Sequence, residues 1–178
     1  NIKLSEPQLA RLKKKRIEAA QKGSKARILK ISKTVQEIQR TSVKDIGKIS
    51  KRELWLMGVV LYWRERFLNK NDADLKKGVR FTSSDPHLIK LFLKWLSDAG
   101  GIKNEEINFD IFIGKNSKNL LDGAVDYWTD ITGFSKTNFS RYYILKSSKR
   151  SLLRIRVKAS SMLVRQIDGW AKGIQKTL

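Results

Sequence analysis

Most of the side chains in this sequence that could do chemistry are basic. Its 178 residues include 38 lysines and arginines against 17 aspartates and glutamates, which gives a formal net charge of +21. Charges of one sign repel each other, so an excess of this size indicates a polyanionic partner. Nucleic acid is therefore the first partner to consider.

The sequence contains no cysteine and a single histidine, His87. This composition excludes a disulfide framework, a zinc site built from Cys and His, and thiol nucleophiles. A hydrolytic reaction would have to use carboxylates, hydroxyls, amines or a metal ion. The first carboxylate to consider is Glu65, near the C-terminal end of an apolar helix, where its charge opposes the helix dipole. The alternative is a surface ion pair with Arg64 or Arg66.

Between positions 134 and 167 the sequence holds nine basic residues and no acidic residue. The nine in this segment are Lys136, Arg141, Lys146, Lys149, Arg150, Arg154, Arg156, Lys158 and Arg165. In the last predicted strand, Leu153, Ile155 and Val157 should face the core. The basic residues that alternate with them, Arg154, Arg156 and Lys158, then lie on the opposite face, because successive side chains of a strand point to opposite sides.

Polar residues of two earlier predicted strands should join this face. Arg80 and Thr82 lie in a strand predicted over residues 79–83, and Asn108 lies in a strand predicted over 107–113. Arginine and asparagine can make bidentate contacts with guanine and adenine edges, and a two-stranded ribbon fits the major groove. Lysines would hold phosphates, and one of Tyr142 and Tyr143 would stack on a base. The alternative is an ordinary solvated sheet face.

The elements that position these residues are predicted from periodicity and capping patterns. Ser50-Lys51-Arg52-Glu53 is a capping box before an apolar run, and it predicts a helix to about residue 68 that is central or faces a second subunit. Asp85-Pro86 begins another helix, which Gly100-Gly101 ends. Further predictions are a helix at 118–132, a hairpin of 141–146 and 151–158, and a final helix capped by Ser160. The order indicates an α+β domain, with about four short strands covered on one face by helices.

Residues 1–50 form a basic arm. They include 14 basic and 4 acidic side chains. Ile28, Ile31, Val35 and Ile38 recur at helical spacing but make only a narrow apolar stripe. We therefore expect a partly helical arm, followed by one domain at residues 51–178. The alternative is a flexible tail that binds phosphates.

Three segments of the domain resemble a known family. GVVLYWRER at 58–66 resembles a divergent LAGLIDADG helix, and FTSSDPHLIKLFLKWL at 81–96 is similar to the strand, turn and helix of LAGLIDADG homing-endonuclease domains. LLRIRVKASSMLVRQIDGW at 152–170 is similar to the strand and helix that close such domains. The resemblance, over roughly residues 50–178, implies a saddle of antiparallel strands in the DNA major groove. One motif per chain implies a homodimer on a near-palindromic site.

The resemblance also assigns a role to Glu65. In the family, the late acidic residue of the motif binds a divalent metal beside the scissile phosphate. Glu65 would then be both the catalytic and the metal-binding residue, with Mg²⁺ as the cofactor. The flanking positions are usually small in the family, whereas here they are Arg64 and Arg66. The helix predicted at 118–132 also has no counterpart in the usual order of elements.

Three functions are consistent with these patterns. The first is double-stranded DNA binding with metal-dependent phosphodiester cleavage, the second is DNA binding by a regulator that no longer cleaves, and the third is RNA or ribosome association. The longest apolar run, Leu54 to Trp63, is too short to span a membrane. We therefore expect a cytoplasmic, nucleoid-associated protein with no membrane partner.

Overall fold

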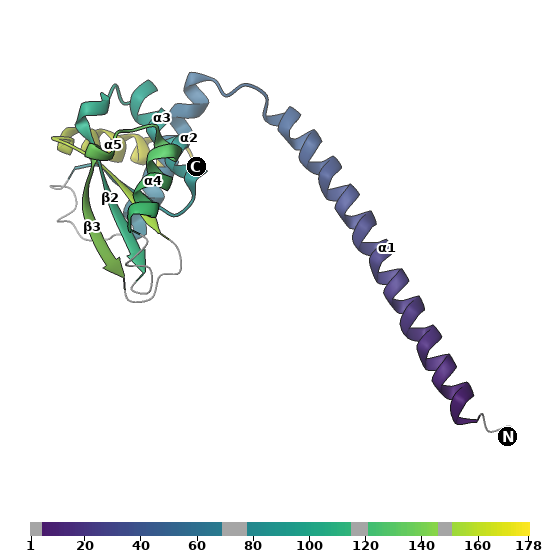
Figure 1. Ribbon diagram of the computed structural model, residues 1–178. Helices are drawn as coiled ribbons and strands as arrows, with labels where there is room; N and C mark the ends of the chain where they lie inside the picture. Colours follow the sequence, from purple (N-terminus) through teal and green to yellow (C-terminus); the bar gives the residue numbers. More distant parts are fainter. Residues whose placement is uncertain (1–4, 69–77, 115–120, 146–150) are drawn as a thin grey trace. The chain divides into compact units, whose positions relative to one another are not determined.

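The computed structural model describes residues 5–68, 78–114, 121–145 and 151–178 (Figure 1). The chain divides into two compact units, residues 1–49 and residues 50–178. None of the helices in the described segments combines the length and the apolarity that crossing a bilayer requires.

The first unit consists mainly of one long helix, α1 (Glu6–Ile46). At its start, the backbone N–H of Ser5 donates to Gln8 Oε1 at 3.0 Å. At its end, Gly47 adopts a φ of 59°, a conformation that glycine tolerates best. No residue of α1 is buried, and Ile28 in the predicted apolar stripe is 62% exposed. The helix is therefore more continuous than the partly helical arm that the sequence predicted.

The second unit is an α+β domain, as the sequence predicted. Its elements in chain order are α2 (Lys51–Leu68), β1 (Arg80–Ser83), α3 (Pro86–Asp98), η2 (Asn104–Glu106), β2 (Ile107–Gly114), α4 (Leu121–Thr132), η4 (Lys136–Asn138), β3 (Phe139–Leu145), β4 (Leu152–Val157) and α5 (Ser161–Thr177). Each helix and strand that the sequence predicted for this unit is present among the described residues. Positions 118–120 and 146 of the predicted elements lie outside the described residues. The two short 3₁₀ turns, η2 and η4, were not predicted.

The four strands form one mixed sheet in the order β1-β4-β2-β3. β4 pairs antiparallel with β1 and with β2, whereas β2 and β3 run parallel. Two predictions are therefore wrong: the sheet is not all-antiparallel, and β3 and β4 do not form a hairpin. Alternation of apolar and polar residues shows which side chains share a face, but it does not select the neighbouring strand. The mostly exposed β3 lies at the edge, and the alternating β4 lies inside the sheet.

Helices pack against one face of the sheet and build the core with it. Phe81, Ile155 and Phe109 are paired across β1, β4 and β2, and each is at most 3% exposed. The ring of Phe92 in α3 lies 4.5 Å from the ring of Phe81 and 5.4 Å from that of Trp95, measured between centroids. Trp95 has no exposed surface, so this tryptophan packs in the core and is not available to stack on a base.

Strand β2 is buried on both faces, whereas its alternating sequence predicted one solvated face. Seven of its eight residues are buried. On the side away from the core, the Arg154 guanidinium lies 4.4 Å from the centre of the Phe112 ring, and the Tyr143 ring stacks on the same ring at 4.9 Å. Polar groups of β2 must therefore find partners within the protein, because burial without a hydrogen bond is costly.

Helix α2 begins at the predicted capping box. The Ser50 N–H donates to Glu53 Oε2 at 2.6 Å, and the Glu53 N–H donates to Ser50 Oγ at 3.2 Å. The helix buries only part of its surface: Val59 has no exposed area, whereas Val60 and Phe67 are 48% and 64% exposed. The described residues of the second unit therefore do not surround α2, although its sequence is apolar on nearly every side. Packing of α2 against a second subunit stays a prediction.

Ser160 is the N-cap residue of α5, but its side chain does not cap the helix as predicted. Its buried hydroxyl accepts a hydrogen bond from the Val79 N–H at 2.7 Å and donates one to the Val157 carbonyl at 2.8 Å. Gly78 has a φ of 77°, and a Cβ atom there would lie 2.5 Å from Ser160 Oγ. These contacts fix the start of β1 beside the end of β4.

The packing of α2 against α3 can be tested at Gly58. A Cβ atom at this position would lie 2.0 Å from Cδ1 of the buried Trp95. We expect Gly58→Ala to lower the free energy of unfolding by about 1–3 kcal/mol, because the added methyl group overpacks the contact. Urea denaturation measures the change. Gly173→Ala in α5, where no atom lies within 4 Å of the new Cβ, should instead raise stability by about 0.5–1 kcal/mol; equal effects would contradict this packing.

Candidate nucleic-acid interface

The sheet face opposite the core carries most of the predicted binding residues. Residues paired across neighbouring strands point to the same face. One row contains Arg80, Arg156 and Asn108, and the next contains Thr82, Arg154, Asp110 and Arg141. The structure thus brings together six of the predicted residues on a surface that we call the arginine face: Arg80, Thr82, Asn108, Arg141, Arg154 and Arg156.

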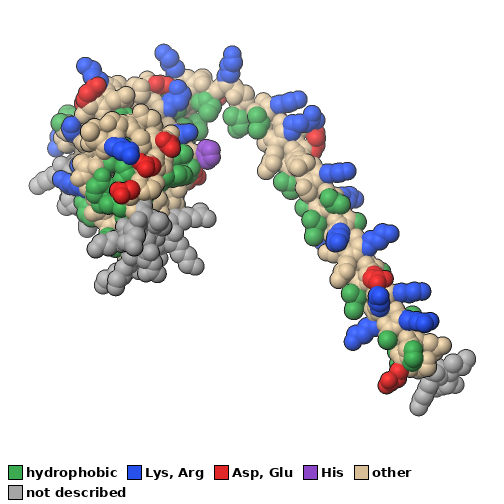
Figure 2. Space-filling view, in the orientation of Figure 1, with side chains coloured by type: hydrophobic (Ala, Val, Ile, Leu, Met, Phe, Trp, Pro, Cys, Tyr) green, Lys and Arg blue, Asp and Glu red, His purple; other side chains and the backbone are tan. Residues whose placement is uncertain are grey.

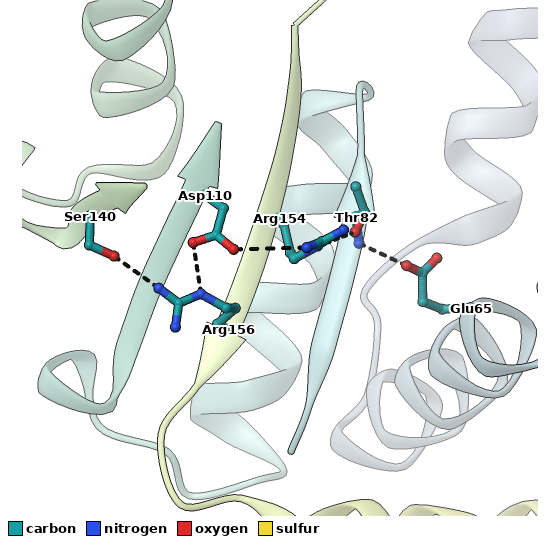
Figure 3. A network of polar contacts seen from close by, with 6 residues as sticks. All are labelled: Glu65, Thr82, Asp110, Ser140, Arg154 and Arg156. Atoms are coloured by element: carbon teal, nitrogen blue, oxygen red, sulfur yellow. Dashed lines mark hydrogen bonds and ion pairs between the residues drawn. The ribbon is translucent and has the colours of Figure 1, made fainter. Parts of the chain in front are cut away.

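Asp110 lies at the centre of the arginine face (Figure 3). Its carboxylate is 1% exposed, accepts a hydrogen bond from Arg156 Nε at 2.7 Å and lies 4.0 Å from Arg154 Nη1. A buried carboxylate needs such partners, because an unpaired charge away from water is strongly destabilising. No pattern in the sequence indicates this role of Asp110. The pairing becomes visible only when the register between β2 and β4 is known, and that register is not a local property of the sequence.

Neutral neighbours also hold Arg154 and Arg156 in place. Arg156 Nη2 donates to Ser140 Oγ at 2.9 Å, and Arg154 Nε donates to Thr82 Oγ1 at 3.2 Å (Figure 3). The two side chains remain 29% (Arg154) and 20% (Arg156) exposed. A guanidinium has five N–H groups, and these contacts use only some of them. Both arginines can therefore donate to a ligand from a fixed orientation.

The arginine face carries more positive charge than its buried carboxylate can compensate. Arg80, Arg141, Arg154 and Arg156 share the face with Asp110, which leaves a formal excess of three positive charges. Burial lowers the pKa of Arg154; the charge of Asp110 raises it, and the charge of Arg80 lowers it further. Guanidinium groups that repel each other in this way would be stabilised by an anion.

Two lysines that the sequence predicted to bind nucleic acid, Lys136 and Lys158, are not part of the arginine face. Each contacts another residue of the domain. Lys136 forms an ion pair with Asp126 of α4, whose hydrogen bond and charge raise the pKa of the lysine. Lys158, just after β4, donates from Nζ to the backbone carbonyl of Glu105 at 2.9 Å. The remaining predicted residues, Lys146, Lys149 and Arg150, lie outside the described residues.

Glu65 lies near the end of α2, beside strand β1. Its Oε1 accepts a hydrogen bond from the Thr82 N–H at 3.2 Å (Figure 3). Burial raises the pKa of Glu65, against the opposing effects of Thr82, Arg154 and Arg64. A cavity of about 90 Å³ opens here, which we call the α2–β1 cavity. Its lining residues are Tyr62, Glu65, Arg66, Gly78, Arg80, Thr82 and Arg154.

The two arginines that flank Glu65 in the sequence have different surroundings. Arg66 Nη1 donates to Asp168 Oδ1 of α5 at 2.9 Å, whereas Arg64 is exposed. Lys172 binds the other carboxylate oxygen of Asp168 at 3.0 Å. A hydrogen bond from Lys172 and the charge of Arg66 lower the pKa of Asp168. Arg66 therefore ties α2 to α5 as well as lining the α2–β1 cavity.

The side chains around the α2–β1 cavity do not fit a Mg²⁺ ion. Mg²⁺ takes oxygen ligands in octahedral geometry, usually including one or two carboxylates. The cavity offers the carboxylate of Glu65 together with three guanidinium groups, which repel a cation. In the segments that the structure describes, no three His, Cys, Asp or Glu side chains are grouped so that they could hold a metal ion. We therefore derive no reaction step through the metal that the family resemblance implies.

No protein-family model matches the chain, and no curated protein or solved structure is significantly similar to it. The LAGLIDADG resemblance of the three sequence segments stays a hypothesis. The features of the chain that bear on its function are the arginine face, the α2–β1 cavity and α1.

The importance of Asp110 as a counter-charge can be tested by replacement. In Asp110→Ala, Arg154 and Arg156 lose the carboxylate that they share. We expect the free energy of unfolding to fall by about 3 kcal/mol, the lower end of the range for a broken buried pair, because both arginines keep some exposure. Asp126→Ala, which removes an exposed carboxylate paired with Lys136, should cost less than about 1 kcal/mol. Urea denaturation distinguishes the two, and equal losses would contradict this role of Asp110.

Proposed function

We propose that this chain binds duplex DNA and that the arginine face is the surface that reads the bases. The observation that carries the proposal is that four arginines, from β1, β3 and β4, share one side of the sheet around a single carboxylate. A β-surface can enter the major groove, and arginine can recognise guanine through two hydrogen bonds. Contacts with Thr82 and Ser140 hold two of these arginines in one orientation. Such preorganisation reduces the conformational entropy lost on binding.

Helix α1 would supply contacts with phosphates. Twelve of its 41 residues are basic and four are acidic, and all are exposed. Figure 2 shows Lys and Arg side chains along the length of this helix. Arg40 forms an ion pair with Glu37 at 2.8 Å, but the acidic residues are too few to compensate the rest. Contacts of lysine and arginine with phosphates hold DNA in place without reading its sequence.

The LAGLIDADG resemblance supports part of this proposal. It implies a sheet that lies in the DNA major groove, which agrees with a basic face opposite the core. Two features differ from what it implies: the sheet is mixed, and the side chains around Glu65 do not suit Mg²⁺. We therefore propose DNA binding without assigning cleavage to Glu65, and the homodimer stays a prediction.

Duplex DNA suits the arginine face better than duplex RNA does. The major groove of A-form RNA is too deep and narrow for side chains to read, whereas that of B-form DNA is about 12 Å wide. A competition between duplex DNA and structured RNA at matched salt separates these partners. Displacement of the DNA by RNA would favour the RNA-associated function instead.

The salt dependence of DNA binding tests the role of α1. A quadruple variant replaces four basic residues of α1 with glutamine: Lys13→Gln, Lys14→Gln, Lys15→Gln and Arg16→Gln. We expect it to bind every duplex more weakly, by the same factor for each sequence. The slope of log affinity against log salt should become shallower by up to about 3–4, because each phosphate contact contributes roughly 0.9. Fluorescence anisotropy with labelled duplexes between about 50 and 200 mM salt measures this slope.

A matched control removes the same charge from other helices. Its four glutamines replace Lys90, Lys94, Lys172 and Lys176 of α3 and α5. We expect the salt slope of this control to equal that of the wild type. If both quadruple variants lost the same slope, binding would depend on total charge and the specific role of α1 would be disproved.

Base reading by the arginine face can be tested at Arg141. This side chain is exposed, and it has no hydrogen bond or ion pair with another described residue. Arg141→Lys keeps the charge but removes the planar pair of donors. Against a duplex selected from a random library, we expect discrimination between sequences to fall by about 1–3 kcal/mol at an unchanged salt slope. Arg165→Lys on α5 is the control, and equal discrimination by both variants would argue against base contacts by Arg141.

A further inference from the structure

The α2–β1 cavity gathers three guanidinium groups around one carboxylate. Arg66 comes from α2, Arg80 from β1 and Arg154 from β4, and the carboxylate belongs to Glu65. These four groups carry a formal charge of +2 around a space of about 90 Å³. The cavity is thus polar, roomy enough for more than one water molecule, and suited by its charge to an anion.

Arg80 has the least satisfied side chain in this cavity. Its Nε is buried and has no hydrogen-bond partner. A buried N–H group without a partner is costly, so such a group commonly marks the place of a water molecule or an ion. No carboxylate among the described residues forms an ion pair with Arg80, although Glu65 lines the same cavity.

The other two arginines have carboxylates outside the cavity. Arg66 pairs with Asp168 at 2.9 Å, and Arg154 lies 4.0 Å from Asp110. Arg80 has no such carboxylate. Burial lowers the pKa of Arg154 most, and the charge of Arg80 lowers it further. The cavity therefore holds two guanidinium groups whose repulsion an anion would relieve.

We propose that the α2–β1 cavity binds one phosphate group, with Arg80 as the main donor and Arg66 and Arg154 beside it. A planar guanidinium presents paired N–H groups that match two oxygens of a phosphate. Glu65 accepts a hydrogen bond from the Thr82 N–H. In this site Glu65 does not bind a metal ion, and its negative charge weakens the binding of an anion. The inference rests on the proposed function, because a backbone phosphate of DNA would be the ligand. A free phosphate has the same chemistry and is distinguished by experiment.

Replacement of Glu65 separates a phosphate site from a metal site. Glu65→Gln removes a negative charge but keeps an oxygen that can accept the hydrogen bond from Thr82. A phosphate group should then bind more tightly, because a repulsive charge is gone. A divalent cation would bind more weakly, because it would lose its carboxylate ligand.

The test titrates inorganic phosphate and dimethyl phosphate into the full-length chain without nucleic acid, by calorimetry at constant ionic strength. We expect saturable binding to the wild type and an affinity at least about tenfold lower in Arg80→Gln, as for the loss of a charged hydrogen bond. Glu65→Gln should bind several-fold more tightly. Arg52→Gln, which removes an exposed guanidinium at the other end of α2, should bind like the wild type.

A second substitution covers the case in which Arg80→Gln does not fold. Arg80→Lys keeps the positive charge but loses the planar pair of donors, so it should bind both probes more weakly than the wild type. Saturable binding of dimethyl phosphate indicates a phosphodiester ligand, whereas binding of inorganic phosphate alone indicates a free phosphate. Absence of binding to the wild type would overturn the inference. Equal affinities of the Arg80 and Arg52 variants, or weaker binding by Glu65→Gln, would also overturn it.

Duplex DNA binding, measured in parallel, separates this inference from the proposed function. Phosphate binding that depends on Arg80, in a protein that binds no duplex, would support the cavity site and overturn the proposed function. Duplex binding by a protein that binds neither phosphate probe would overturn the cavity site and leave the proposed function in place.

Discussion

The ion pairs of Asp110 determine how much of the arginine face is structural and how much is available to a ligand. This carboxylate is buried in an inner strand and needs partners, of which Arg156 at 2.7 Å is the nearest. The pair favours one register between β2 and β4, because a shift by one residue would turn Arg156 toward the core. One carboxylate cannot compensate four guanidinium groups, however. Arg80 and Arg141 keep the surface basic after the internal pairs have formed.

Besides Asp110, two described acidic residues of the domain, Asp126 and Asp168, form ion pairs that connect elements of the fold. Asp168 binds both Arg66 and Lys172, and through Arg66 it links α5 to α2. Asp126 of α4 forms an ion pair with Lys136 of η4, just before β3. Positive charge without an ion pair among the described residues remains at Arg80 and Arg141 on the arginine face and along most of α1. Charges of one sign repel each other, so the polyanionic partner proposed above would relieve this excess.

Local patterns in the sequence were enough to predict most of the elements. Alternation of Leu153 and Ile155 with Arg154 and Arg156 predicted which side of β4 would face the core, and the burial of these residues confirms it. Local patterns could not predict which strands lie next to each other in the sheet. β3 and β4 are adjacent in the sequence but are separated in the sheet by β2. The role of Asp110 depends on that order, since only β4 beside β2 brings both arginines to its carboxylate.

Glu65 shows why the identity of one residue does not assign a chemistry. Its position in the motif-like helix implies a metal ligand, and its pKa is raised by burial, as the pKa values of many functional carboxylates are. The charges next to Glu65 determine whether the site attracts a cation or an anion. Beside one or two further carboxylates Glu65 would attract a divalent cation, but beside Arg66, Arg80 and Arg154 the same carboxylate lies in a positive field. Three guanidinium groups around a single carboxylate therefore favour an anion over a divalent cation at this position.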